Sequence, residues 1–104
     1  MTRLLLLAAL TAAAFPAAAQ TGAKPARLGL CAACHGEDGR ARVAEAPNLA
    51  GQRFDYLLKA MRAYKAGQRD VPAMRAALGP LSDADLEQLA HWYAGLAPCA
   101  AGAR

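Results

Sequence analysis

Two cysteines and a histidine form the most chemically specific pattern in this chain of 104 residues. Cys31, Ala32, Ala33, Cys34 and His35 make a Cys-x-x-Cys-His motif, which is the attachment signature of c-type haem. Two thiols three positions apart on one helical turn can reach the two vinyl groups of a porphyrin and form thioethers. The imidazole of the next residue then projects along the haem normal to the iron. The motif therefore predicts one haem, attached through Cys31 and Cys34, with His35 as an iron ligand.

Three other kinds of site could use the same cysteines. A thioredoxin-like redox pair needs no histidine and expects a βαβ context, which this sequence does not indicate. A zinc site needs four ligands. Cys31, Cys34, Cys99 and a histidine would make four, but Cys99 and the histidine do not have the spacing that is usual for a pair of zinc ligands. A disulfide between Cys31 and Cys34 would close a strained small loop. Haem attachment is favoured because it also accounts for the adjacent histidine.

The second iron ligand has several candidates. Sulfur from methionine raises the reduction potential of a haem, whereas a second histidine lowers it. Met74 follows Pro72 in an irregular connector between two predicted helices, where its side chain can be held at a fixed point. Met61 lies on an apolar helix stripe, and His91 is about 200° round its helix from the buried Leu89 position. We expect Met74 as the ligand; Met61, His91, an open iron position and an ordinary core role for Met74 are the alternatives.

Length and composition allow one small domain that needs additional stabilisation. Hydrophobic residues make up 56% of the chain but aromatic residues only 6%, and much of the apolar content is alanine, which buries little area. A small chain of this kind needs a disulfide, a metal, a cofactor or a partner. The length excludes a barrel enzyme or a two-domain dehydrogenase. The formal net charge of +4 comes without a basic run, so a nucleic-acid partner is not expected.

The first 19 residues have the pattern of a secretory signal peptide. A positive charge at Arg3, an apolar run and the small residues Ala17-Ala18-Ala19 follow one another in the required order. The apolar run is shorter than the ~20 residues that span a bilayer, so an uncleaved anchor is the weaker interpretation. We expect residues 1–19 to be cleaved, leaving a periplasmic domain over residues 20–104 with no membrane span. Cysteines in the periplasm are expected to be paired, metallated or covalently occupied, because unprotected thiols oxidise there.

Apolar periodicity predicts an all-α fold. A helix over residues 26–33 runs into the cysteine motif, a glycine- and proline-rich loop covers residues 36–51, and a short helix covers residues 73–78. An amphipathic helix that ends at Gly67 is predicted by an apolar stripe made of Phe54, Leu57, Leu58, Met61 and Tyr64. Ser82 is an N-cap candidate for the last helix. The buried face of that helix is expected to contain Leu86, Leu89, Ala90, Tyr93 and Leu96.

The chain resembles the class I c-type cytochromes, specifically the short mono-haem bacterial proteins and one half of the di-haem periplasmic cytochromes. The resemblance covers nearly all of residues 26–96. The strongest motif is Cys31-Ala32-Ala33-Cys34-His35-Gly36, and the second is Pro47-Asn48-Leu49-Ala50-Gly51-Gln52. The region of Arg69 and Met74 is similar to the same extent as the second motif. Weaker helical similarity involves residues 56–57, 64–67, 81–83, 89–90 and 92–94.

The resemblance implies a fold and a role for individual residues. The fold would have three main helices and a short helix wrapped around one covalently bound haem. His35 would be the proximal ligand, with its other ring N–H donated to the carbonyl of Pro47, and Met74 would be the distal ligand. The pocket would be lined by Leu49, Tyr56 and Leu57. Arg69 would either pair with a haem propionate or remain a solvated surface arginine.

These residues favour an electron carrier over an enzyme. With His35 and Met74 both on the iron, no position is open for a substrate, and the sequence shows no acid–base pair or activated nucleophile. The main hypothesis is a periplasmic protein that cycles haem c between Fe(III) and Fe(II) and shuttles electrons between redox partners, such as a terminal oxidase or reductase. The alternative is a haem subunit of a periplasmic dehydrogenase with a flavin-containing partner, as in the flavocytochrome sulfide dehydrogenases. A haem sensor would require Met74 not to bind the iron.

Cys99 departs from the family pattern. It lies in a predicted loose tail over residues 97–104. An odd cysteine in an exported protein is a free thiol, part of a contact with a partner subunit, or half of an intermolecular disulfide. The sequence leaves these three interpretations open.

Overall fold

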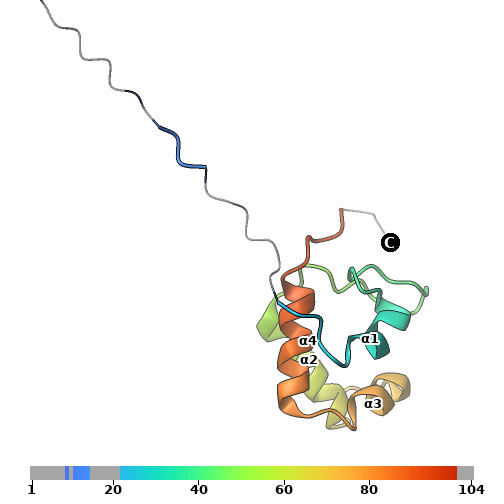
Figure 1. Cartoon of the computed structure of the whole chain (residues 1–104). Helices are drawn as coiled ribbons and strands as arrows, with labels where there is room; N and C mark the ends of the chain where they lie inside the picture. The colour runs from blue at the N-terminus through green and yellow to red at the C-terminus, as the bar shows by residue number, and fades with distance from the viewer. Residues whose placement is uncertain (1–8, 10, 15–21, 101–104) are drawn as a thin grey trace, which may run out of the picture.

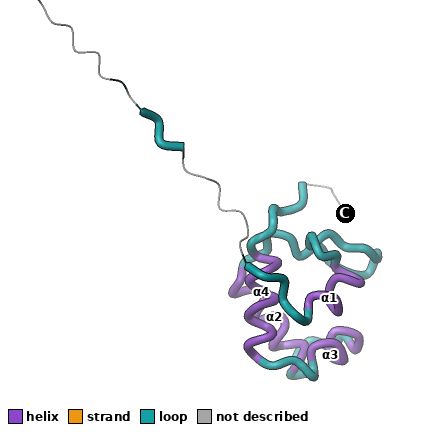
Figure 2. Tube along the Cα trace, viewed as in Figure 1, coloured by secondary structure: helices purple, strands orange, loops and turns teal. Residues whose placement is uncertain are grey.

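The computed structural model describes residue 9, residues 11–14 and residues 22–100. Its helices are α1 (Leu28–His35), α2 (Phe54–Lys65), α3 (Pro72–Leu78) and α4 (Asp83–Ala94). α2 packs against both α4 and α3, and a long loop joins α1 to α2 (Figure 1). Figure 2 shows helices and loops only, so the described part of the chain confirms the predicted all-α class.

The predicted signal peptide lies outside the described residues, apart from residue 9 and residues 11–14. No helix in the described ranges is long and apolar enough to cross a membrane.

The core is built mainly from leucine. Its buried members are Leu28, Leu57, Leu58, Leu78, Leu81, Leu86, Leu89, Ala90 and Tyr93. Each fully buried leucine contributes about 2 kcal/mol relative to an exposed one. The predicted buried face of the last helix is confirmed at four positions, while Leu96 is only half-buried and packs against the edge of the core.

The predicted amphipathic helix forms α2 and ends as expected at Gly67. There the N–H of Gln68 donates to the carbonyl of Ala63 at 2.9 Å, and the N–H of Gly67 donates to the carbonyl of Tyr64 at 3.1 Å. This pair of bonds is a Schellman motif, which needs a left-handed residue. Gly67 supplies it with φ 76°.

Two helices begin at positions other than those predicted. Residues 26–27 form a turn, in which the N–H of Leu28 donates to the carbonyl of Pro25 at 3.0 Å, so α1 begins at Leu28 and reaches His35. α3 begins at Pro72, because proline fixes the helical φ and its missing N–H costs nothing in the first turn. The short helix predicted over residues 73–78 is confirmed, and the placement of Met74 in an irregular connector is wrong, because Met74 lies within α3.

The predicted N-cap of the last helix is present as a capping box. The Ser82 hydroxyl accepts from the backbone N–H of Asp85 at 3.1 Å, and the Asp85 carboxylate accepts from the backbone N–H of Ser82 at 3.0 Å. Two orphan N–H groups at the start of α4 are satisfied in this way. Arg62 of α2 also donates to both carboxylate oxygens of Asp83, at 2.8 and 2.6 Å.

The capping box makes stability depend on pH. Hydrogen bonds from the backbone and hydroxyl of Ser82 hold the pKa of the Asp85 carboxyl below its usual value. A carboxylate with a lowered folded-state pKa stabilises the fold above the unfolded pKa and loses that contribution as pH falls through the folded pKa. We expect the free energy of unfolding to decrease as pH falls below about 4, and Asp85→Asn to weaken this decrease.

Denaturant unfolding across this pH range measures the effect. Asp70→Asn is the matched control, because Asp70 is an exposed aspartate before α3. An equal pH dependence in wild type and Asp85→Asn would contradict the assignment.

Candidate haem site

The cysteine motif occupies α1. Cys31 and Cys34 lie one turn apart on this helix, where Cys31 is half-buried and Cys34 is exposed. His35 is the last residue of α1, and only 7% of its surface is exposed. No disulfide joins any of the three cysteines, all of which the structure describes. Burial raises the pKa of the Cys31 thiol.

A hydrogen bond across the following loop orients the His35 ring. Its Nδ1 lies 2.9 Å from the carbonyl oxygen of Pro47. A carbonyl only accepts, so Nδ1 carries the hydrogen, and in the neutral imidazole Nε2 then has the lone pair. The ring is therefore held in the tautomer that can bind a metal through Nε2.

The loop between His35 and Pro47 is ordered by its own backbone. The N–H groups of Leu49 and Ala50 both donate to the carbonyl of Gly39, at 2.8 and 3.1 Å. Gly39 has φ 76°, and a Cβ at this position would lie 2.5 Å from the Ala50 nitrogen. Only glycine permits this approach, which brings the Pro47 segment back to the end of α1.

Two further bonds complete the loop. The amide oxygen of Asn48 accepts from the N–H of Ala41 at 2.8 Å, and the N–H of Arg42 donates to the carbonyl of Cys34 at 2.7 Å. Sequence reasoning quoted Asn48 only as part of a motif and missed its bond. The signal was its residue type, because asparagine side chains commonly satisfy backbone groups in turns.

α4 holds both ends of the loop through two aromatic residues. The Tyr93 hydroxyl donates to the carbonyl of Gly36 at 2.9 Å, and Trp92 Nε1 donates to the carbonyl of Glu37 at 2.9 Å. The N–H of Gly51 donates to the backbone carbonyl of Tyr93, also at 2.9 Å. Burial, followed by the influence of Cys31, Glu37 and Asp38, raises the pKa of Tyr93 well above its usual range. Sequence reasoning missed these bonds, although a buried tyrosine or tryptophan usually requires a polar partner.

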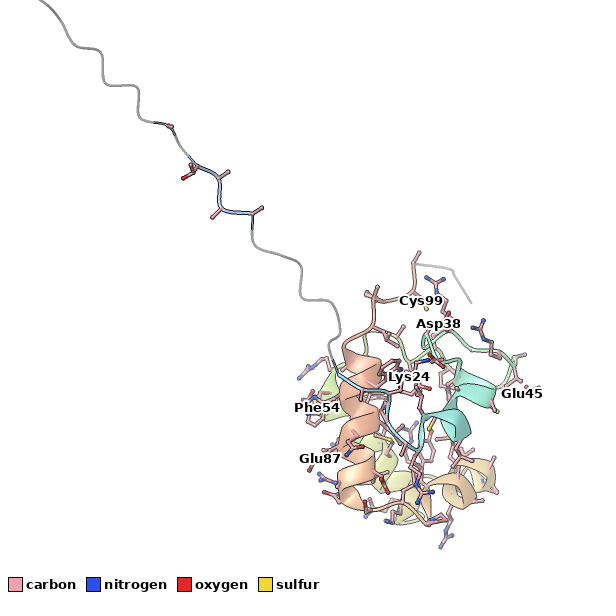
Figure 3. The ribbon with its side chains drawn as sticks, in the orientation of Figure 1. Lys24, Asp38, Glu45, Phe54, Glu87 and Cys99 are labelled. Atoms are coloured by element: carbon pink, nitrogen blue, oxygen red, sulfur yellow. The ribbon has the colours of Figure 1, made fainter. Side chains whose placement is uncertain are left out.

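The candidates for the second iron ligand occupy different environments. Met74 of α3 and Met61 of α2 are both half-buried and both pack against the core. His91 is exposed, and its ring stacks on that of Phe54 with centroids 4.1 Å apart. It therefore lies off the buried face of α4, as its helix position predicts. Phe54 lies at the outer side of the α2–α4 pair in Figure 3.

The remaining predicted pocket residues differ widely in exposure. Leu57 is buried and Leu49 is half-buried against the core. Tyr56 is 52% exposed, so about half of its surface remains in contact with solvent. The Arg69 guanidinium lies 4.4 Å from the centre of the Tyr64 ring.

The donor set fits a covalently bound haem. Two thiols lie on one helical turn, and the adjacent imidazole presents Nε2 in its metal-binding tautomer. The zinc alternative has no support in the described ranges, where no group of three or more His, Cys, Asp and Glu residues could hold a metal ion. The thioredoxin-like alternative also lacks support, because the described residues contain no strand.

The segment after α4 contacts the domain through Pro98. Pro98 packs so closely on Gly51 that a Cβ on Gly51 would lie 2.8 Å from the Pro98 Cβ. Cys99 follows and is half-buried, in the segment that leaves α4 in Figure 3. The predicted tail is thus in contact with the domain at Pro98, and residues 101–104 lie outside the described part.

The known proteins that are similar in sequence to this chain include several c-type cytochromes. Residues 17–92 match the family model described as cytochrome c oxidase, cbb3-type, subunit III. Cytochrome c4 of Pseudomonas aeruginosa is 43% identical over 94 residues, which are 90% of this chain and 46% of that protein. Cytochrome c-554(548) of Halomonas halodenitrificans is 39% identical over 70 residues, which are 64% of this chain and 84% of that protein.

A relative with a more specific name is also similar. The thiosulfate dehydrogenase electron acceptor of Thiomonas intermedia is 36% identical over 99 residues, which are 94% of this chain and 46% of that protein. The chain thus spans about half the length of this relative and of the cytochrome c4 relatives.

The Tyr93 hydroxyl provides a direct test of how the loop is held. We expect Tyr93→Phe to lower the free energy of unfolding by about 1–2 kcal/mol, because the carbonyl of Gly36 loses a buried partner. Denaturant unfolding measures this change. Tyr56→Phe is the matched control, because half of the Tyr56 side chain is already exposed. Equal stabilities of the two variants would refute the role given to the Tyr93 hydroxyl.

Proposed function

This chain belongs to the class I c-type cytochromes, and from that premise we propose that it is a periplasmic electron carrier that shuttles single electrons between redox proteins. Its cofactor is one haem c, and the cysteines that would hold it are Cys31 and Cys34. When bound, this group takes up one electron at Fe(III) and releases it from Fe(II). The protein itself is proposed to have no catalytic activity.

The observation that carries the proposal is the bond from His35 Nδ1 to the carbonyl of Pro47. Such a bond fixes the orientation of a ligating histidine and raises its basicity. The same histidine directly follows Cys34 at the end of α1. One short segment therefore contains both the cysteines that would attach the haem and the histidine that would bind the iron. The loop that follows this segment is held by α4.

Met74 is the proposed distal ligand. It lies four residues before the buried Leu78, so the two share one face of α3, and that face packs against the core. The resemblance to the family assigns the distal ligand to this position. Two protein ligands leave no iron position open for a substrate, which suits outer-sphere electron transfer.

Export to the periplasm is proposed from the sequence of residues 1–19. A charged start, an apolar run and small residues before Gln20 favour cleavage there, and haem attachment to Cys31 and Cys34 protects both thiols from the oxidising compartment.

A second candidate function is supported by the relatives named thiosulfate dehydrogenase electron acceptor. The similarity to that of Thiomonas intermedia covers 94% of this chain. The chain would then accept electrons directly from a periplasmic dehydrogenase, such as one with a flavin-containing subunit, and remain bound to it. The carrier remains the main proposal because the cytochrome c4 and c-554(548) relatives carry no such partner in their names.

Isosteric substitution of the two methionines tests the ligand assignment. Leucine removes sulfur with little change in volume. We expect Met74→Leu to abolish the sulfur-to-iron absorption band of the oxidised holoprotein and to lower its reduction potential. Met61→Leu is the matched control and should retain both properties. Loss of the band in Met61→Leu alone would make Met61 the ligand, and a wild-type protein without the band would favour the sensor hypothesis.

Recovery of the protein from its native periplasm distinguishes the carrier from the subunit. We expect the haem-bearing protein to elute alone, near its own mass, after size-exclusion chromatography at low salt. Cys99→Ser is run in parallel to remove any disulfide-linked species. Elution in a fixed ratio with a flavin-containing chain would establish the subunit function instead.

A further inference from the structure

We propose that Arg75 is a positioning residue for Met74, and that it acts together with Arg69 by holding the Met74 segment against the C-terminal turn of α2. This inference rests on the proposed function, in which Met74 is the distal iron ligand. It concerns two exposed arginines on either side of that methionine.

The Arg75 guanidinium lies flat over Gly67. A Cβ on Gly67 would be 3.1 Å from Arg75 Cζ, 3.1 Å from Nη1 and 3.3 Å from Nη2. Three nearly equal distances mean that the plane of the guanidinium faces this position. Gly67 has no Cβ and a φ of 76°, so it serves both the turn and the approach of the arginine.

The end of α2 is a suitable place for a cation. The last carbonyls of a helix carry partial negative charge and attract cationic side chains. A guanidinium also stacks well on flat surfaces, because it is planar and weakly hydrated. Both properties stabilise Arg75 over the backbone of the Gly67 turn.

Arg69, which precedes Met74 in the chain as Arg75 follows it, contacts the same end of α2. Its guanidinium lies 4.4 Å from the centre of the Tyr64 ring, and its backbone N–H donates to the carbonyl of Ala63 at 3.2 Å. Ala63 and Tyr64 belong to the last turn of α2. The chain between the two arginines, including the first turn of α3, is therefore held at both ends.

These contacts matter because α3 is only seven residues long. A helix of this length is not stable by itself, so the position of Met74 depends on what holds α3 to its neighbours. Without the Arg75 contact, local opening of α3 becomes more frequent. The methionine sulfur would then leave the iron more readily, even in a folded protein.

Displacement of the methionine by imidazole measures this effect. The oxidised holoprotein is titrated with imidazole, and loss of the sulfur-to-iron band gives the midpoint. We expect Arg75→Ala to lower the midpoint about threefold, the size of the attraction between an exposed cation and the C-terminal end of a helix, and Arg75→Lys to restore it only in part, because an ammonium cannot stack flat. Arg53→Ala is the matched control, since Arg53 pairs with Asp55 at the opposite end of α2 and should leave the midpoint unchanged.

A double-mutant cycle with Gly67→Ala isolates the contact itself. The strain of φ 76° is the same in both backgrounds and cancels, whereas displacement of the guanidinium occurs only when Arg75 is present. We expect Gly67→Ala to lower the imidazole midpoint more in the wild-type background than in Arg75→Ala.

The outcomes separate this inference from the proposed function. An Arg75→Ala midpoint equal to that of wild type, or a lower global stability with an unchanged midpoint, overturns the role of Arg75 and leaves the electron carrier intact. Additive effects in the cycle also overturn it. A wild-type protein without the band, or with a band that Met74→Leu retains, overturns the ligand assignment on which both proposals depend.

Discussion

The hydrogen bond between His35 Nδ1 and the carbonyl of Pro47 is the contact on which the rest of the site depends. It joins the end of α1 to a loop residue twelve positions later, so the whole intervening loop must be ordered to place one carbonyl. Gly39 allows the two sides of the loop to approach, and the Asn48 amide satisfies a backbone N–H inside it. The hydrogen bond of one imidazole therefore requires a defined conformation of the entire segment between the cysteine motif and α2.

The α2–α4 pair supports this loop through hydrogen bonds from α4. Its stability comes mainly from buried leucines, because the ion pairs between these helices are exposed and such pairs contribute little. Besides packing against α2, α4 donates hydrogen bonds from Tyr93 and Trp92 to the two residues that follow His35. A packed helix thus positions the site through side-chain donors at its C-terminal end.

On the proposed function, the two iron ligands are held by different means. His35 is buried, and its segment is held by hydrogen bonds, of which the one from the Tyr93 hydroxyl is buried. Met74 lies on a helix of seven residues, and the two arginines that contact α2, one before this helix and one within it, are exposed to solvent. Exposed contacts open more easily than buried ones. The methionine side of the site is consequently the side where local motion would first change iron coordination.

The sequence alone determined whatever depends on local chemistry. The Cys-x-x-Cys-His spacing identified the attachment segment, the apolar period predicted α2, and Ser82 marked the start of α4, because each signal involves residues within a few turns of one another. The partner of His35 was obtained from family resemblance rather than from spacing. Only the tertiary structure decided that Tyr93 bonds to Gly36, that Trp92 bonds to Glu37, and that Arg75 packs on Gly67. No local period encodes such contacts, since they join side chains to backbone atoms of other elements and arise only once the helices have packed.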